Sequence, residues 1–171
     1  LFFTTRGRMF KLTCYEIPEA GRTAKGTAIV NLLQLDGGEK VTTVIPVDED
    51  QGGNLVMATK NGLIKKTALS EFRNLRASGL IAVTLREDDE LIGVTLTDGS
   101  RELLLGTRQG MSIRFHEDDV RTMGRTAMGV RSIDLAPGDE VVSMSAVQED
   151  CEVLTISENG YGKRTPEAEY R

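Results

Sequence analysis

The sequence predicts an all-β fold, a propeller-like array of four-stranded antiparallel blades of which the chain contains about three and a half. Three observations predict it. A hairpin-like segment recurs roughly every 50 residues. A second glycine follows each hairpin in a loop. Stretches rich in Val, Ile and Thr then complete each repeat. Repeated four-stranded units with this period are typical of radial arrays whose blades pack face to face.

The recurring hairpin occurs in four segments, LFFTTRGRMFK, VMATKNGLIKK, LLGTRQGMSIR and LTISENGYGKR. Their glycines are 55, 48 and 50 residues apart: Gly7, Gly62, Gly110 and Gly160. A hydroxyl residue stands three positions before each glycine: Thr4, Thr59, Thr107 and Ser157. A cation stands four positions after each: Lys11, Lys66, Arg114 and Arg164. The expected repeats therefore cover residues 1–53, 54–102, 103–150 and, incompletely, 151–171.

Local chemistry explains why each repeat begins with a hairpin. The dipeptides Asn61-Gly62 and Asn159-Gly160 favour a tight turn, because glycine adopts positive φ without a Cβ clash. The second glycines lie in the loops that follow: Gly26, Gly79 and Gly129. The segments VTTVIPV, ELIGVTLT and EVVSMSAV supply further strands. No segment keeps a 3.6-residue apolar period, so only single helical turns such as ALSEF are expected.

Composition excludes several classes of protein. At 171 residues and 39% hydrophobic content the chain can bury a core, yet no apolar run reaches the roughly 20 residues that cross a bilayer. Cys14 and Cys151 lack metal-binding spacing, and we expect two buried free thiols in a reducing cytoplasm. His116 is the only histidine, which disfavours zinc sites and His-based triads. We expect no metal site.

Charge is distributed unevenly within each repeat. The net charge of −5 by itself argues against a nucleic-acid partner. However, the hairpin halves of the first three repeats (1–33, 60–81 and 108–131) contain 15 Lys and Arg against 6 Asp and Glu. The other halves contain 3 Lys and Arg against 17 Asp and Glu. A cation that recurs once per blade would form a stripe along one edge, which suits the phosphates of duplex DNA.

The candidate DNA-binding residues are the cations of the hairpins and glycine loops. They are Arg6, Arg8, Lys11, Arg22, Lys25, Lys60, Lys65, Lys66, Arg73, Arg76, Arg108, Arg114, Arg121, Arg125, Arg131, Lys163 and Arg164. Aromatic content is 5% with no Trp, so contacts to the duplex backbone are expected instead of base stacking. Reversing Lys11, Lys66 and Arg114 to Glu is expected to weaken binding without unfolding the chain. The alternative interpretation is a set of solubilising residues on exposed hairpins.

Catalytic patterns are weak. The string GYGKRT lacks the glycine and the strand-to-helix context of a phosphate-binding loop. The acidic clusters at residues 87–90 and 117–119 are expected to be solvated turns. Tyr15, Tyr161 and Tyr170 are not candidates for a DNA-cleaving tyrosine. A protein-interaction module that uses the acidic strips and a propeller enzyme with axial carboxylates stay open as alternatives.

The segments GRTAKGTAIVNLL, NGLIKKTALSEF, MGRTAMGVRSIDL and NGYGKRTPEAEY resemble the repeats of the DNA gyrase A C-terminal domain family along the whole chain. The resemblance implies a six-bladed β-pinwheel whose blades exchange a strand with a neighbour. It also implies a basic outer edge that wraps DNA for ATP-dependent negative supercoiling. The heptapeptide Gln-Arg-Arg-Gly-Gly-Lys-Gly of gyrases is not in the sequence, and the related topoisomerase IV domain, which binds DNA crossings, stays open as the alternative.

The same resemblance implies the setting in which the chain acts. The chain is expected to be non-catalytic and without cofactors, in a bacterial, nucleoid-associated protein whose other domains use ATP and Mg²⁺. Implied partners are double-stranded DNA, the B subunit of gyrase and a second A subunit, with no membrane. Because the last repeat is incomplete, unpaired strand edges are expected, with fraying or strand-swapped association.

Overall fold

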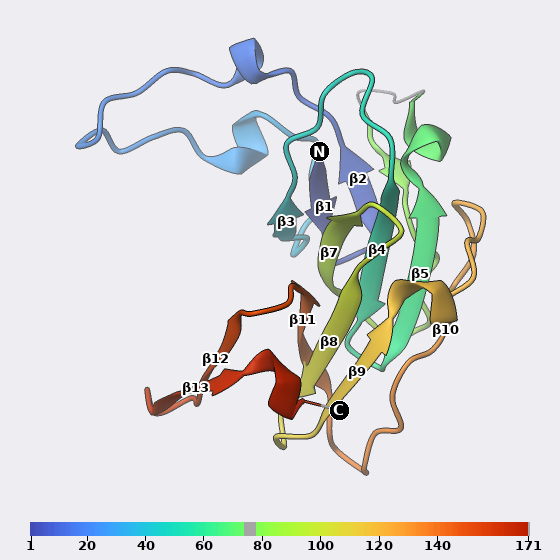
Figure 1. The fold of residues 1–171 in the computed structure, drawn as a ribbon. Coiled ribbons are helices and arrows are strands. Elements are labelled where there is room, and N and C mark those ends of the chain that lie inside the picture. Colours follow the sequence, from blue (N-terminus) through green and yellow to red (C-terminus); the bar gives the residue numbers. More distant parts are fainter. Residues whose placement is uncertain (74–77, 171) are drawn as a thin grey trace.

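A computed structural model of the chain describes residues 1–73 and 78–170, and the predicted candidate Arg76 lies outside them. The described residues form thirteen β-strands and five single-turn 3₁₀ helices (Figure 1). The strands are β1 (Phe2–Thr4), β2 (Arg8–Phe10), β3 (Val41–Val44), β4 (Asn54–Thr59), β5 (Leu63–Ala68), β6 (Leu80–Ile81), β7 (Leu91–Thr97), β8 (Glu102–Thr107), β9 (Ser112–His116), β10 (Val130–Arg131), β11 (Val141–Val147), β12 (Glu152–Ile156) and β13 (Gly162–Pro166). The 3₁₀ helices are η1 (Cys14–Glu16), η2 (Ile29–Asn31), η3 (Leu69–Phe72), η4 (Glu117–Asp119) and η5 (Glu167–Glu169). The predicted all-β class and low helix content are confirmed.

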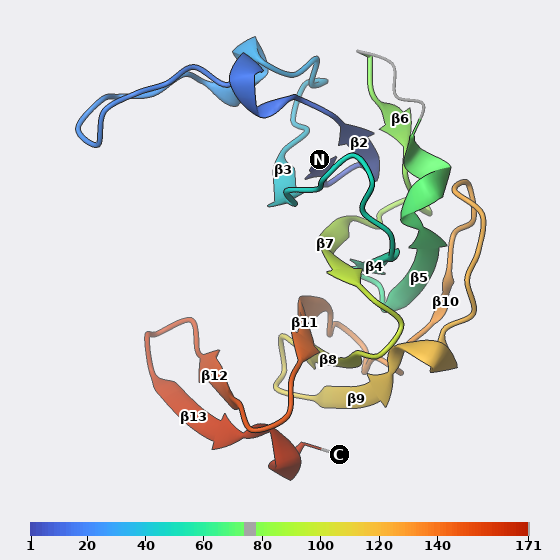
Figure 2. The same ribbon diagram turned by 45° about the horizontal axis from the view of Figure 1, so that its top comes forward.

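The strands form four antiparallel sheets, which we call the first to fourth blades. Their strand orders are β3-β1-β2-β6, β10-β5-β4-β7, β11-β8-β9 and β12-β13. Figure 2 shows the blades following one another along an arc, with β3, β7 and β11 towards its inner side and β6 and β10 towards its outer side. The four-stranded blade is thus present twice, and the third and fourth blades have three strands and two among the described residues.

The outermost strand of each complete blade comes from the next repeat. β6 pairs with β2, matching Leu80 with Met9, and β10 pairs with β5, matching Val130 with Ile64. The glycine before each exchanged strand permits this close approach. A Cβ on Gly129, which has φ +101, would lie 2.5 Å from the Ile64 carbonyl oxygen. The implied strand exchange is therefore present, and the second recurring glycine is needed for it.

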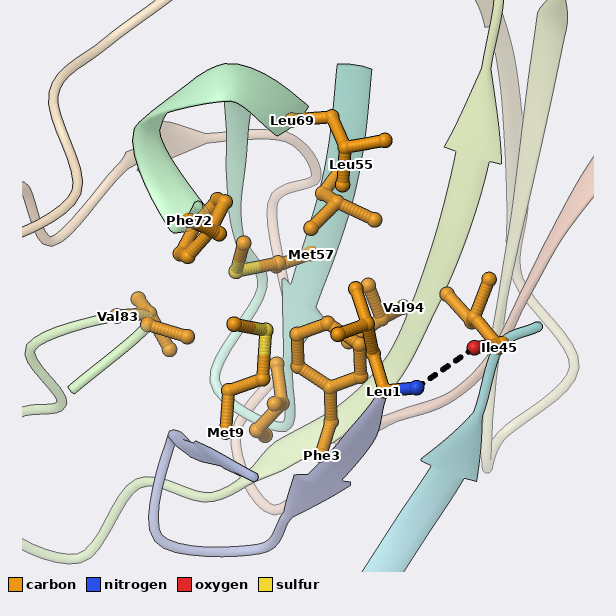
Figure 3. Close-up of a cluster of buried hydrophobic side chains, with 12 residues drawn as sticks. Leu1, Phe3, Met9, Ile45, Leu55, Met57, Leu69, Phe72, Val83 and Val94 are labelled. Carbon is orange, nitrogen blue, oxygen red and sulfur yellow. Dashed lines mark hydrogen bonds between the residues drawn. The ribbon is translucent and has the colours of Figure 1, made fainter. Parts of the chain in front are cut away.

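Neighbouring blades bury apolar side chains against one another, in two interfaces that we call the first and second seams. At the first seam Phe3 and Met9 of the first blade pack against Leu55 and Met57 of β4 (Figure 3). At the second seam the other side of β4 packs against the third blade: Val56, Ala58, Ile64, Leu103, Leu105 and Val141 form this cluster. Because β4 is covered on both faces, its sequence is a continuous apolar run instead of an alternating one.

Backbone hydrogen bonds connect the blades at the hairpin turns. The amide of Leu91 in β7 donates to the Thr5 carbonyl of the first blade at 3.0 Å. The amide of Val141 in β11 donates to the Lys60 carbonyl of the second blade at 2.9 Å. The same bond therefore joins each hairpin turn to the innermost strand of the next blade, and it fixes how far one blade is rotated from the next.

The exposure of the two cysteines differs from the expectation from composition. Cys14 is exposed and Cys151 is half-buried, so the prediction of two buried thiols is wrong, although both cysteines are free. Each lies in a connection outside the seam clusters, which explains its exposure. Among residues 1–73 and 78–170 no helix is long and apolar enough to span a membrane.

Candidate nucleic-acid interface

The hydroxyl residues three positions before the hairpin glycines, which we call the hydroxyl column, close the hairpin turns. In every hairpin the side-chain oxygen accepts a hydrogen bond from the backbone amide that follows the glycine. The pairs are Thr4 with Arg8 at 3.3 Å, Thr59 with Leu63 at 3.1 Å, Thr107 with Met111 at 3.1 Å and Ser157 with Tyr161 at 3.2 Å. Since these hydroxyls satisfy backbone donors, the column has a structural role.

Acidic residues from the loop before the next inner strand also hold the turns. Asp89 accepts the amide of Asn61 at 2.9 Å, and Asp139 accepts the amide of Gln109 at 3.0 Å. Partial burial opposes ionisation of Asp139. The neighbouring Thr107 hydroxyl and the hydrogen bonds from the amides of Gln109 and Glu140 outweigh that effect and lower the pKa of Asp139. Part of the acidic charge in each repeat is therefore needed for the fold.

The two acidic clusters are not uniformly solvated. Asp89 and Glu117 are buried, so the prediction of solvated turns is wrong for these two residues, whereas their described neighbours in the clusters are exposed. The Glu117 carboxylate accepts the hydroxyl of Thr97 at 2.6 Å and the amides of Gly99 and Arg101, each at 2.9 Å. It thereby fixes the connection between β7 and β8. The Glu117 carboxylate can be buried because these backbone amides supply its hydrogen bonds.

Two of the four cations that stand four residues after a hairpin glycine, Lys66 and Arg114, reach the following blade. Lys66 Nζ donates to the Glu117 carbonyl of the third blade at 2.8 Å and lies 3.3 Å from the Asp118 carboxylate. Arg114 Nη1 donates to the Glu167 carbonyl of the fourth blade at 2.8 Å. We call Lys66 and Arg114 the clasp cations. Each reaches the first residue of the 3₁₀ helix in the following blade.

The expectation that this column is exposed is wrong for the clasp cations. The exposed fraction of the side chain is 6% for Lys66 and 18% for Arg114. Lys11, the equivalent residue of the first repeat, is exposed. Reversing the charge of the clasp cations should therefore disturb the fold, contrary to the expectation from sequence.

Arg8 and Lys65 are also committed to internal contacts. Arg8 forms ion pairs with Asp36 and Glu39, both at 2.9 Å, and its guanidinium lies 4.8 Å from the Phe10 ring centroid. Lys65 is 1% exposed, and its Nζ donates to the carbonyls of Ala82 and Arg125. Both were expected on the exposed basic edge, and this expectation is wrong. Arg8 is ion-paired with carboxylates, and Lys65 donates hydrogen bonds to carbonyl groups, in the outer part of a blade.

The other candidates lie on the surface in four groups. The outer-edge cations, on β10 or in the loops leading to the exchanged strands, are Arg73, Arg121, Arg125 and Arg131. The turn cations are Arg6, Lys60 and Arg108. The arm cations, between β2 and β3, are Lys11, Arg22 and Lys25, and the terminal cations on β13 are Lys163 and Arg164. Lys60 and Arg125 are half-buried and the rest are exposed.

The turn cations and the outer-edge cations differ in whether a carboxylate lies close to them. Each turn cation lies within 4 Å of a carboxylate: Arg6 with Asp36 at 3.6 Å, Lys60 with Glu140 at 3.4 Å and Arg108 with Glu140 at 3.5 Å. Within the described residues no carboxylate lies that close to Arg73, Arg121 or Arg125, and Arg131 pairs only with the exposed Asp134. Among the described residues, unpaired positive charge therefore remains at Arg73, Arg121 and Arg125 of the outer edge, and also at the arm cations and Lys163, and it favours a polyanionic ligand.

Among residues 1–73 and 78–170, the features considered for catalytic chemistry lie in separate segments. Across the described part of the chain no group of three His, Cys, Asp or Glu residues could hold a metal ion. Residues 160–165 form the turn and second strand of the β12–β13 hairpin, so they are not a phosphate-binding loop. His116 accepts the Asp118 amide at 3.2 Å and caps η4. Tyr15 and Tyr161 are 88% and 82% exposed and lie in unrelated segments.

An arc of antiparallel blades, two of them four-stranded with an outer strand taken from the next repeat, is the architecture of a β-pinwheel domain. The family model described as "DNA gyrase C-terminal domain, beta-propeller" matches residues 1–48, 53–98, 101–148 and 152–171. The chain belongs to this family. The resemblance stated from the repeat segments is thereby confirmed.

Known relatives and solved structures agree with the assignment. The DNA gyrase A protein of Salmonella typhimurium is 51% identical over 99% of the chain, and that of Haloquadratum walsbyi is 47% identical over all of it. The chain spans about a fifth of the length of these proteins (20% and 21%). The crystal structure of the C-terminal domain of DNA topoisomerase IV matches with a TM-score of 0.90 and 31% identity, covering 99% of this chain and 54% of that one. The DNA gyrase A C-terminal domain matches with a TM-score of 0.83 and 25% identity, with the same coverage.

Reversal of a clasp cation is expected to destabilise the fold. Lys66→Glu places a carboxylate beside Asp118 and the Glu117 carbonyl at a buried position, and we expect a loss of about 3–5 kcal/mol in the free energy of unfolding. Lys11→Glu is the matched control from the same column, and its exposed side chain should change stability by less than about 0.5 kcal/mol. Urea denaturation followed by circular dichroism measures both. Equal stability of the two variants would contradict the clasp role.

The pH dependence of stability provides a test of Lys65. Burial, and secondarily the charge of Arg125, lower the pKa of Lys65 from 10.5 to about 8. Between pH 8 and 10.5 the unfolded chain binds more protons at this residue than the folded chain, so its contribution to stability rises with pH in that window. We expect Lys65→Met to remove about 1–3 kcal/mol of this rise, allowing for partial solvent screening. Parallel pH profiles for the wild type and the variant would overturn this description of Lys65.

Proposed function

We propose that the chain binds duplex DNA without sequence specificity along its outer edge and bends it around the arc. One observation carries the proposal: no carboxylate of the described residues lies within 4 Å of the outer-edge cations Arg73, Arg121 and Arg125, whereas the turn cations are paired. Phosphate neutralisation needs positive charge that is not already compensated. Membership of the gyrase A C-terminal domain family supports the same function.

In the complete protein this binding would support ATP-dependent negative supercoiling by DNA gyrase. The identities of 47–51% to gyrase A proteins favour gyrase. ATP and Mg²⁺ would act in other domains, and the B subunit of gyrase with a second A subunit would be partners through those domains. The protein would act in the cytoplasm, at the nucleoid. A topoisomerase IV role, in which the domain binds DNA crossings, is the second candidate because of the 0.90 TM-score to that domain.

One observation weighs against both of the other functions considered. Asp89, Asp139 and Glu117 accept backbone amides, which reduces the acidic surface that a protein-interaction module would offer. The same bonds leave fewer carboxylates for a propeller glycosidase, whose reaction needs two carboxylates flanking a bound sugar.

A salt titration of duplex binding tests the proposal. The double variant Arg73→Glu/Arg121→Glu should bind a long duplex at least about tenfold more weakly than the wild type at low salt. The log–log salt slope should also become shallower by about 0.9 for each phosphate that the variant no longer neutralises. The matched control is Lys40→Glu/Arg86→Glu, two exposed cations in the acidic halves of the repeats. The proposal fails if the control variant loses the affinity and the outer-edge variant keeps it.

A further inference from the structure

The loop between η4 and β10 (residues 120–129) carries two of the outer-edge cations, Arg121 and Arg125. It leads into β10, the strand that the third repeat adds to the second blade. Figure 2 shows this η4–β10 loop beside β5, on the outer side of the arc. Because ordering a loop on binding costs affinity, the contacts of the loop backbone determine how well its two arginines can bind a ligand.

Lys65 of β5 joins the η4–β10 loop to a second connection. Its side chain is buried, and its Nζ donates hydrogen bonds to the Ala82 carbonyl and to the Arg125 carbonyl. Ala82 directly follows β6, the strand exchanged onto the first blade, whereas Arg125 precedes β10, the strand exchanged onto the second. One buried ammonium group therefore holds the end of one exchanged strand against the loop that leads into the next.

Thr84 forms a second bond between the same two connections. It lies between β6 and β7, and its hydroxyl donates to the Thr126 carbonyl at 2.8 Å. Thr84 is exposed and uncharged and stands in the acidic half of its repeat, so charge patterning does not single it out. The Met123 amide adds a third bond, to the Lys66 carbonyl at 2.8 Å. The η4–β10 loop of the third repeat is therefore held in place by the second repeat.

The first blade has a related arrangement with a different cation. Arg8 is ion-paired with Asp36 and Glu39, and its Nη2 donates to the Ser78 carbonyl at 2.9 Å. Ser78 lies just before β6, in the segment that leads into the exchanged strand. In both blades a cation with internal contacts thus holds the backbone of the segment that leads into an exchanged strand. The internal cations and the outer-edge cations of the basic halves therefore have separate tasks.

We propose that Lys65 and Thr84 are positioning residues for DNA binding, which hold the η4–β10 loop against the second blade so that Arg121 and Arg125 meet duplex phosphates already ordered. The proposal rests on the proposed function of the outer edge. A loop that is held only part of the time binds more weakly, in proportion to the fraction of molecules in the competent conformation. Neither positioning residue contacts a phosphate, because Lys65 is buried and the Thr84 hydroxyl donates to a carbonyl.

The affinity for a long duplex and its salt dependence test the proposal. Thr84→Val removes the hydroxyl at an exposed position, so the unfolding transition should not change. Its affinity at low salt should fall about threefold, in line with the loss of one hydrogen bond. The log–log salt slope should stay at the wild-type value, because no phosphate contact is removed. Thr84→Ser keeps the hydroxyl and should restore the affinity. Lys65→Met should lower the affinity about tenfold, also with an unchanged slope.

A double-mutant cycle separates positioning from a general effect on the fold. In the Arg121→Gln/Arg125→Gln background, Thr84→Val should have no further effect on affinity, because Thr84 acts only through the loop that carries these arginines. Wild-type affinity of Thr84→Val, no rescue by Thr84→Ser, or an undiminished effect in that background would each overturn the proposal. If Arg121→Gln/Arg125→Gln itself bound DNA as tightly as the wild type, the proposed function of the outer edge would fail, and the positioning role with it.

Discussion

Burial of apolar surface between consecutive blades is the interaction on which the rest of the structure depends. The second blade shares its core with both neighbours: β4 directs Leu55 and Met57 to one side and Val56 and Ala58 to the other. The first blade also buries Phe2 and Phe10 with Leu33 in a separate cluster. Each buried side chain of this size contributes about 1.5–3 kcal/mol relative to its exposed state. The exchanged strands and the amide bonds at the hairpin turns then hold each pair of blades at one rotation. Stability therefore resides in the seams, as in other repeat proteins.

The same seams determine where charge is placed. Because each blade is related to the next by a fixed rotation, equivalent residues of the loops before β6 and β10 lie on the outer side of the arc. The clasp cations and Arg8 form contacts within and between the blades, and the turn cations are paired with carboxylates. Among the described residues, Arg73, Arg121 and Arg125 of the outer edge and the arm cations have no carboxylate within 4 Å. A rigid arc of this kind would present phosphate-binding groups along a curve, so DNA that follows it would have to bend.

The repeat period predicted the fold, because the hairpin glycines, the hydroxyl column and the second glycines each satisfy a backbone requirement that recurs in every blade. The same columns could not reveal which cations are buried. Lys11, Lys66, Arg114 and Arg164 occupy one column, yet burial depends on whether the following blade covers them, which is a property of the seam. The burial of Asp89 and Glu117 could not be predicted either. Both stand in acidic turns of the sequence, and the amides that they bind are 16 to 28 residues away.

Hydrogen exchange of individual amides tests the central claim most directly. The amides of Leu91 and Val141, which cross the two seams, should exchange with the same free energy of opening as the amide of Met57 inside β4, because the blades can only unfold together. A free energy of opening at Leu91 and Val141 that is several kcal/mol lower than at Met57 would show that the blades open independently. That result would contradict the claim that the blades are stable only together.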